Sequence, residues 1–131
     1  MAATSTSFAI VDYPGSLQSA VYDFEELLSI SSRLCVLNQF DREFDVEILS
    51  LEQIEQIEQR PVATKDYAVI FLPPSLDSIF YLDPGPALLA WLVEQHGAGS
   101  KLCSACAGNA ALPWERPVRN RGSRTACRIW L

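Results

Sequence analysis

The chain has 131 residues, a length that fits one domain, and its 49% apolar and 20% charged residues exclude wholesale disorder. Residues 1–112 carry 15 acids and 5 bases, a net charge of −10, whereas residues 113–131 carry five arginines and one acid, a net charge of +4. The acidic body argues against nucleic-acid binding, and the longest apolar stretch outside a strand-like segment, Ala87–Val93, is far shorter than the ~20 residues of a membrane helix.

The first third of the chain predicts a strand, a helix and a second strand. Ser7–Tyr13 is a short apolar, β-branched run that ends at a Pro-Gly pair, as a buried strand followed by a turn does. Ser16 is then placed to cap a helix. Phe44–Leu49 alternates apolar and polar residues, which is typical of a half-buried strand. The spacing predicts that one face of the helix carries a set of apolar residues: Leu17, Ala20, Val21, Phe24, Leu27, Leu28, Leu34 and Cys35.

The remaining elements alternate in the same way. Leu51–Gln59 has an apolar residue at every third position and predicts either a short helix or an elaborated connection. Tyr67–Leu72 is the best candidate for a buried strand, and Pro84–His96 predicts a helix with a proline in its first turn and a glycine after it as terminator. Ser100–Ser104 is the next predicted strand, and Ala107–Leu112 a short helix.

Strands that alternate with helices, together with a fully apolar central strand, predict an α/β fold with a parallel sheet covered on both faces. Ligands of such sheets bind beyond the carboxyl ends of the strands. The turns at Tyr13–Gly15, Pro73–Ser75 and Ser104–Cys106 are therefore expected at one edge of the sheet.

Cys106 lies where a predicted strand runs directly into a helix, a sharp turn that projects a side chain from the sheet edge. The amino terminus of a helix favours a thiolate and lowers its pKa. The N–H of Ala107 is placed to stabilise an oxyanion, and the N–H of Ser75 from the neighbouring turn could be a second donor. The alternative is that Cys106 is a small buried hydrophobe.

A redox pair and a zinc site are two other kinds of site that cysteines can form. Cys103 and Cys106 form a Cys-x-x-Cys, but Cys103 falls within a predicted strand, so its side chain is expected to point away from Cys106. Zinc would need two more ligands, and Cys35, Cys127 and the single histidine provide no second pair at a suitable spacing. We therefore predict no metal site and no cofactor.

His96 is the only histidine, so any thiol–imidazole dyad would have to use it. It precedes the strand that leads to Cys106, which predicts that it lies at the opposite edge of the sheet. Glu25 and Glu26 are the acids nearest the sheet edge in sequence. A carboxyl beside the thiol could change the reactivity of the thiol. Acids at such positions more commonly lie on a solvated face of a helix.

The cellular compartment follows from the amino-terminal segment. Residues 1–7 have neither a basic region nor an apolar core, so they do not resemble a secretory signal. We expect a cytoplasmic protein whose four cysteines are free thiols.

Five segments, in matching order and spacing, resemble the ThiJ/PfpI domain, which has the class I glutamine-amidotransferase-like fold: Tyr13–Gly15, Ser19–Tyr22, Leu72–Leu76, Ala87–Leu92 and Leu102–Gly108. The closest likeness is to the version at the amino terminus of GlxA-type AraC-family transcriptional regulators, and it spans about residues 7–112. The resemblance implies a flavodoxin-like three-layer sandwich with a mostly parallel sheet, usually dimeric. It also implies that Cys106 occupies the nucleophile-elbow position, beside a pocket lined by the backbone of Ser75, Ala107 and Gly108.

The chain departs from the ThiJ/PfpI pattern at two places. Ala20 stands where ThiJ/PfpI enzymes commonly have an acid that contacts the thiol. After residue 112, where the resemblance implies a strand with the usual catalytic histidine, the chain has no histidine and becomes rich in arginine. We therefore expect a sheet that is incomplete at the C-terminus and an irregular tail over 113–131, which a truncation, a reading-frame change or a genuine variant would each explain.

The resemblance implies a ligand-sensing or dimerisation domain of an AraC-type transcriptional regulator, without its DNA-binding part. Such a domain would bind a small molecule and form homo-oligomers, without direct contact to DNA or membrane. The alternative is a small ThiJ/PfpI-type enzyme, such as a hydrolase, an isonitrile hydratase or a glyoxalase-like protein, that uses Cys106. A third reading is a non-functional product of a damaged gene. A histidine partner for Cys106 would separate the first two.

Overall fold

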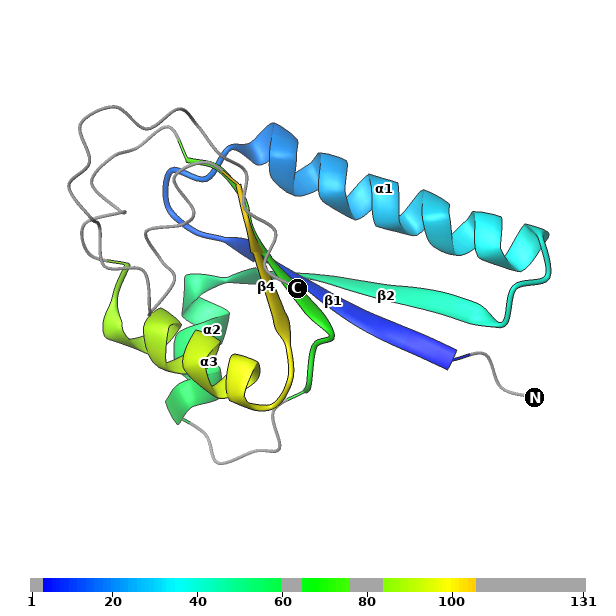
Figure 1. Ribbon diagram of the computed structural model, residues 1–131. Coiled ribbons are helices and arrows are strands. Elements are labelled where there is room, and N and C mark those ends of the chain that lie inside the picture. The colour runs from blue at the N-terminus through cyan, green and yellow to red at the C-terminus, as the bar shows by residue number, and fades with distance from the viewer. Residues whose placement is uncertain (1–3, 60–64, 76–83, 106–131) are drawn as a thin grey trace, which may run out of the picture.

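The computed structural model describes residues 4–59, 65–75 and 84–105. Their helices and strands, in chain order, are β1 (Thr4–Asp12), α1 (Gln18–Leu37), β2 (Arg42–Ser50), α2 (Leu51–Gln59), β3 (Val69–Leu72), α3 (Pro86–Gly97) and β4 (Lys101–Ser104) (Figure 1). Leu51–Gln59, for which the sequence left two structures open, is a helix. The predicted helix at 107–112 and the boundary at residue 113 lie outside the described residues.

The described strands form one parallel sheet in the order β2-β1-β3-β4. This order, with the second strand beside the first and the third on its other side, is that of flavodoxin-like doubly wound sheets. Helix α1 lies over one face of the sheet, and α2 and α3 lie together over the other (Figure 1). The predicted α/β fold, a flavodoxin-like three-layer sandwich, is confirmed.

The main core fills the layer between the sheet and helices α2 and α3. Alternate residues of each strand point into it, because successive side chains of a strand point to opposite faces. Trp91 is fully buried there, and its ring meets Tyr67 edge-on at 6.1 Å between ring centroids. The other core residues of the strands and the two helices are Ala9, Val11, Leu49, Ile54, Ile70, Leu72, Leu88, Leu92 and Leu102.

The opposite face of the sheet is aromatic. Phe8 of β1 meets Phe44 of β2 edge-on at 5.5 Å and lies parallel to Phe71 of β3 at 6.3 Å. Phe24 of α1 stacks on Phe71 at 4.9 Å. One chain of rings therefore joins three strands to the helix that covers them, which fixes α1 on the sheet.

Helix α1 does not bury all the apolar residues that the sequence assigns to one face. Val21 is buried, and Phe24 and Leu28 are half-buried toward the sheet, as predicted. Leu27 and Leu34 are exposed, so their assignment to the buried face was wrong. Each differs by one position, or about 100° around the helix, from a sheet-facing residue, and the sheet covers only one side of α1.

The start of α1 also differs from the prediction. Leu17, not Ser16, is the N-cap residue, and no side chain caps the helix. The Ser16 hydroxyl donates instead to Oδ1 of Asp12 at 2.8 Å. The predicted cap was wrong because Ser16 is held in a β-bridge with Ser75, so the helix begins one residue later, after Leu17.

Helix α3 agrees closely with its prediction. Gly85 caps it with a positive φ of 85°, and Pro86 opens its first turn. Gly97, predicted as the terminator, is the last helical residue, and the left-handed conformation that turns the chain into β4 belongs to Gly99, whose φ is 107°.

Candidate functional site

The turns after β1 and β3 are joined at the carboxyl edge of the sheet. Ser16 and Ser75 form an antiparallel β-bridge, and the Leu17 N–H donates to the Pro74 carbonyl at 2.8 Å. The Ser75 hydroxyl donates to the Gly15 carbonyl at 2.7 Å. These hydrogen bonds fix the two turns against each other at the carboxyl edge of the sheet.

Two further contacts bring β3 and β4 into the same edge. The buried Tyr13 hydroxyl donates to the Pro73 carbonyl, which ties the end of β1 to the end of β3. The Ala105 N–H donates to the Leu72 carbonyl at 3.2 Å, so the chain leaving β4 is held beside β3. The prediction that the three turns meet at one edge is confirmed as far as residue 105.

Asp12 is an acid at this edge. Its Oδ1 accepts hydrogen bonds from the Ser16 hydroxyl and from Nε2 of Gln18, both at 2.8 Å. Nε2 of Gln18 also lies 3.1 Å from the Ser16 hydroxyl oxygen, which closes a small polar ring. The three side chains offer a ligand a carboxylate, a hydroxyl and an amide on two consecutive turns of chain.

Asp12 was not predicted as a site residue. The sequence feature that could have indicated it is a carboxylate directly after the buried run Ile10-Val11, where a strand of a parallel sheet ends. Glu25 and Glu26, which the sequence places as the acids nearest the edge, lie in the second turn or later of α1. Ala20, at the position that the resemblance gives to an acid, is in the first turn of α1 and is half-buried.

Of the predicted pocket residues, the structure describes one. Ser75 lies at the carboxyl edge, half-buried, with its backbone bridged to Ser16. Cys106, Ala107 and Gly108 lie outside the described residues. The described chain ends at Ala105, directly beside the turn that carries Ser75.

His96 lies at the other edge of the sheet. It is in the last turn of α3, and its Nδ1 donates to the Ser100 carbonyl at 3.2 Å, just before β4 begins. The prediction that His96 lies away from the carboxyl end of β4 is confirmed.

Cys103 is in the middle of β4, on the face of the sheet that α1 covers, where it pairs with Phe71. Burial raises the pKa of its thiol, and the charge of Lys101 offsets part of that rise. A thiol with a raised pKa is a poor nucleophile at neutral pH. Within the described ranges, no group of three or more His, Cys, Asp or Glu side chains could hold a metal ion.

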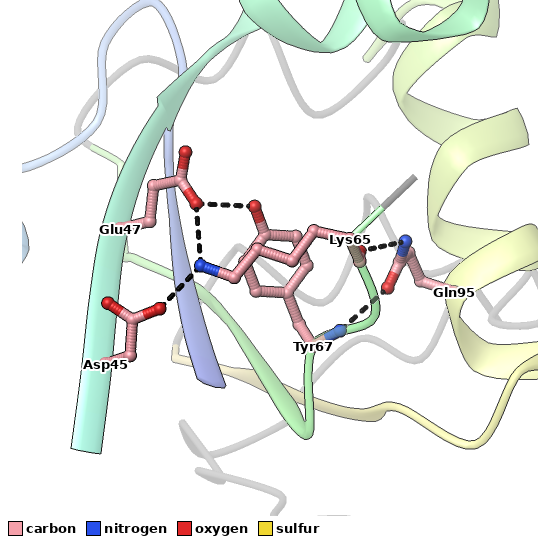
Figure 2. Close-up of polar contacts among 5 residues, drawn as sticks. All are labelled: Asp45, Glu47, Lys65, Tyr67 and Gln95. Carbon is pink, nitrogen blue, oxygen red and sulfur yellow. Dashed lines mark hydrogen bonds and ion pairs between the residues drawn. The ribbon is translucent and has the colours of Figure 1, made fainter. Parts of the chain in front are cut away.

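A second polar cluster lies toward the amino ends of the strands (Figure 2). Nζ of Lys65 contacts Oδ2 of Asp45 at 2.6 Å and Oε2 of Glu47 at 3.3 Å. The Tyr67 hydroxyl donates to the same Glu47 oxygen at 2.8 Å. Gln95 of α3 donates from Nε2 to the Lys65 carbonyl at 3.2 Å and accepts the Tyr67 N–H on Oε1 at 3.3 Å.

The charges of this cluster indicate a structural role. Burial, and then the hydrogen bond to Glu47, raise the pKa of Tyr67. The hydrogen bond to Asp45 contributes most to the raised pKa of Lys65. At neutral pH both groups therefore keep their protons, and the cluster serves to hold the segment before β3 against β2 and α3.

Among the helices that the structure describes, none combines the length and the apolar character needed to cross a membrane.

No protein-family model matches the chain, and no curated protein matches it. Among solved structures, the chain is similar to the crystal structure of Drosophila melanogaster DJ-1beta, with 15% sequence identity and a TM-score of 0.48. The match covers 82% of this chain and 59% of that chain, so this chain spans less than two thirds of the DJ-1beta structure. The likeness concerns the fold alone, and the fold class follows from the strand order and directions given above.

Proposed function

We propose that this chain is a ThiJ/PfpI-like ligand-sensing or dimerisation domain of an AraC-type transcriptional regulator, and that it binds a small molecule without turning it over. The observation that carries the proposal is the position of His96. It is the only histidine of the chain and lies before β4, whereas Cys106 follows the opposite end of that strand. A thiol without an imidazole in reach lacks the usual base for nucleophilic catalysis.

The carboxyl edge supplies the groups that a small polar ligand needs. Oδ1 of Asp12 and the hydroxyls of Ser16 and Ser75 are acceptors on turns that are themselves cross-linked. Polar groups held by a rigid scaffold bind a ligand without a large loss of side-chain entropy. This edge is also where ligands of doubly wound sheets bind. We therefore place the sensing site here, with ligands that carry amide or amine donors.

Charge supports the absence of direct DNA contact. Residues 1–112 carry a net charge of −10, and a surface of that sign repels the phosphate backbone. The proposed regulator would therefore bind DNA through another part of the protein.

An enzyme that uses Cys106 is the second candidate. It is favoured by Asp12, because this carboxylate lies at the edge toward which the chain runs from Ala105. A carboxyl beside the elbow could hold the proton of the thiol in place of an imidazole. Such a protein would be a hydrolase, an isonitrile hydratase or a glyoxalase-like enzyme.

Turnover separates the two candidates. The full chain would be incubated with methylglyoxal and, separately, with an alkyl isonitrile, and product formation followed against a Cys106→Ser variant. We expect equal background rates for both proteins. A rate at least about tenfold above that of Cys106→Ser, which is 1.4 kcal/mol of barrier, would establish the enzyme instead.

Binding is tested by thermal shift. The full chain would be screened against amino acids, small amides and amines, and a hit repeated on Asp12→Asn and on the control variant Val93→Ser, which alters an exposed residue of α3. A ligand at 100 times its Kd stabilises the protein by about 2.7 kcal/mol. We expect Asp12→Asn to lose this shift and Val93→Ser to retain it, whereas equal shifts in both variants would place the ligand elsewhere.

A further inference from the structure

The two faces of the sheet are covered unequally over β3 and β4. On the face toward α2 and α3, Ile70, Leu72 and Leu102 are 0%, 1% and 3% exposed. Successive side chains of a strand point to opposite faces, so the residues between them belong to the face toward α1. These residues are only half-buried: Val69, Phe71 and Cys103.

Helix α1 covers the other half of that face. It packs on β1 and β2, and it reaches β3 through the stack of Phe24 on Phe71. On its opposite flank, the Ser32 hydroxyl accepts a hydrogen bond from the Phe44 N–H of β2 at 2.9 Å. These two contacts fix which flank of α1 is turned toward β3. Among the described helices, no other packs on this face (Figure 1).

The flank of α1 toward β3 carries two exposed leucines. Leu27 lies about 60° around the helix from Phe24, on the side away from Ser32, and Leu34 lies about 20° further. Their exposed fractions are 60% and 52%. Exposed apolar residues that gather in this way mark a contact site. We call this set the uncovered face: Leu27, Leu34, Val69, Phe71 and Cys103.

We propose that the uncovered face binds an amphipathic helix of a partner polypeptide, which lies beside α1 over β3 and β4. Neighbouring strands lie about 4.8 Å apart, so two strands offer a width of about 10 Å. A helix with its side chains has a diameter of about 10 Å. The surface over β3 and β4 therefore takes one helix, in the same layer as α1.

The charged groups at the two ends of the uncovered face set the direction of the bound helix. Asp23 is exposed near the start of α1, about 40° around the helix from Leu27. Lys101 is exposed at the start of β4 and shares a face of that strand with Cys103. Since α1 begins at the carboxyl edge of the sheet and β4 at the amino edge, the two charges stand at opposite ends.

A helix is stabilised by an acid beside its amino end and by a base beside its carboxyl end. The bound helix therefore starts beside Asp23 and ends beside Lys101, so it runs antiparallel to the strands. Helix α1 has the same direction, which the connections of a parallel sheet require of their helices. A basic residue in the first turn of the bound helix would pair with Asp23, and an acid in its last turn with Lys101.

The sequence after β4 does not predict such a helix. Pro113, Pro117 and Gly122 divide it, and residues 116–131 contain no acid to pair with Lys101. We therefore assign the bound helix to a separate polypeptide. This inference goes beyond the proposed function and uses no residue of the carboxyl edge, so failure of the ligand test would leave it standing.

Fluorescence anisotropy of a labelled synthetic peptide tests the uncovered face. The peptide has about 15 residues, with leucines at helical spacing, lysines in its first turn and glutamates in its last. The full chain should bind it with a Kd of about 10–100 μM, because one helix buries less area than a standard interface. Leu27→Glu should weaken binding at least about tenfold, since it places a charge on the apolar surface. Val36→Glu, which adds the same charge at an exposed residue on the flank toward β2, is the matched control and should leave the Kd unchanged.

Four outcomes would overturn the proposal. Two of them are no binding at about 200 μM and an equal Kd in Leu27→Glu and Val36→Glu. Binding that requires deletion of residues 113–131 would assign the uncovered face to the chain itself. A wild-type dimer that Leu27→Glu separates into monomers would assign it to a second copy.

A second peptide, with glutamates in the first turn and lysines in the last, tests the direction. Its charges suit its own dipole, so it is the better helix in isolation, and weaker binding cannot come from lower helicity. The wild-type chain should bind it about tenfold more weakly than the first peptide. The double variant Asp23→Lys, Lys101→Glu keeps the net charge and should prefer the second peptide. Equal binding of the two peptides by the wild-type chain, or an unchanged preference in the double variant, would overturn the proposed arrangement.

Discussion

The side chains of Tyr67 and Lys65 hold the segment before β3 against its neighbours. The Tyr67 hydroxyl and Nζ of Lys65 share one oxygen of Glu47, and the Lys65 ammonium stands 5.4 Å from the centre of the Tyr67 ring. The backbone of the same segment is held by Gln95 and by the Ser100 hydroxyl, which donates to the Tyr67 carbonyl. The segment before β3 is thus fixed by side chains from β2, α3 and the turn before β4.

Alkaline pH should remove the hydrogen bond between the Tyr67 hydroxyl and Glu47. The pKa of Tyr67 is raised from its ordinary value of 10.0, so the unfolded chain loses the phenol proton first as pH rises. The stabilisation is fully present below about pH 10 and is lost as pH rises through the folded pKa. We expect urea denaturation to show a fall in stability above pH 10 that is smaller in Tyr67→Phe, whereas the exposed control Tyr22→Phe keeps the wild-type fall.

At neutral pH the same Tyr67→Phe variant should lose about 0.5–1.5 kcal/mol of stability, the net value of one hydrogen bond. The chemical denaturation midpoint measures this loss. An unchanged midpoint together with an unchanged alkaline slope would mean that the contact with Glu47 does not form in solution.

The cysteines should differ in reactivity. We expect Cys106 to be alkylated first, because its predicted place at a helix N-terminus favours the thiolate. Cys103 should react last of Cys35, Cys103 and Cys106, since burial raises the pKa of its thiol. Brief iodoacetamide treatment and peptide mass spectrometry give the order. Labelling of Cys35 before Cys106 would contradict the elbow assignment.

Most elements could be predicted from the sequence because their apolar residues repeat with a clear period. Pro86 indicated the first turn of α3 and Gly97 its end, and the apolar run around Ile10 indicated β1. The N-cap of α1 could not be predicted, because Ser16 is held in a bridge with Ser75, a residue far along the chain, and the helix begins one residue later. The place of Asp12 in the site was not predicted either, because it follows from the position at which β1 ends and not from a sequence motif.

The stack of Phe24 on Phe71 holds α1 on the sheet, and a substitution measures how much it stabilises the fold. Phe24→Ala removes the ring that stacks on Phe71, and we expect a loss of about 1–3 kcal/mol, below the 3–5 kcal/mol of a fully buried phenylalanine, because Phe24 is half-buried. Val36→Ala, at an exposed position of the same helix, should change stability by no more than about 0.5 kcal/mol. Equal effects would show that α1 is not held by the ring stack.

For the whole molecule, the strand order could not be derived from local sequence. The pattern of alternating strands and helices predicts a parallel sheet, but which strand lies beside β1 depends on crossovers between residues far apart in the chain. The ThiJ/PfpI resemblance implied only a flavodoxin-like sandwich, and the strand order was not predicted. The pocket residues from Cys106 onward remain a prediction of that resemblance.

The charge distribution of the whole chain makes a prediction about DNA. We expect no sequence-specific binding, and only weak binding through residues 113–131 that disappears at moderate salt. Fluorescence anisotropy of a labelled duplex, measured at low and at moderate salt, tests this. Deleting residues 113–131 is the control and should abolish the low-salt signal. Tight binding that survives high salt would overturn the assignment of DNA contact to another part of the protein.

Strand β2 forms one border of the described sheet, and an unpaired border of nine residues is a template on which a strand of another molecule can add. Arg42, Glu43, Asp45 and Glu47 stand along this strand, and a chain adding there would have to bring its own backbone alongside those charges. Growth from the sheet border is thereby discouraged, as in other proteins that must avoid fibrous assembly. The charged residues along β2 therefore limit association of the molecule through this border of its sheet.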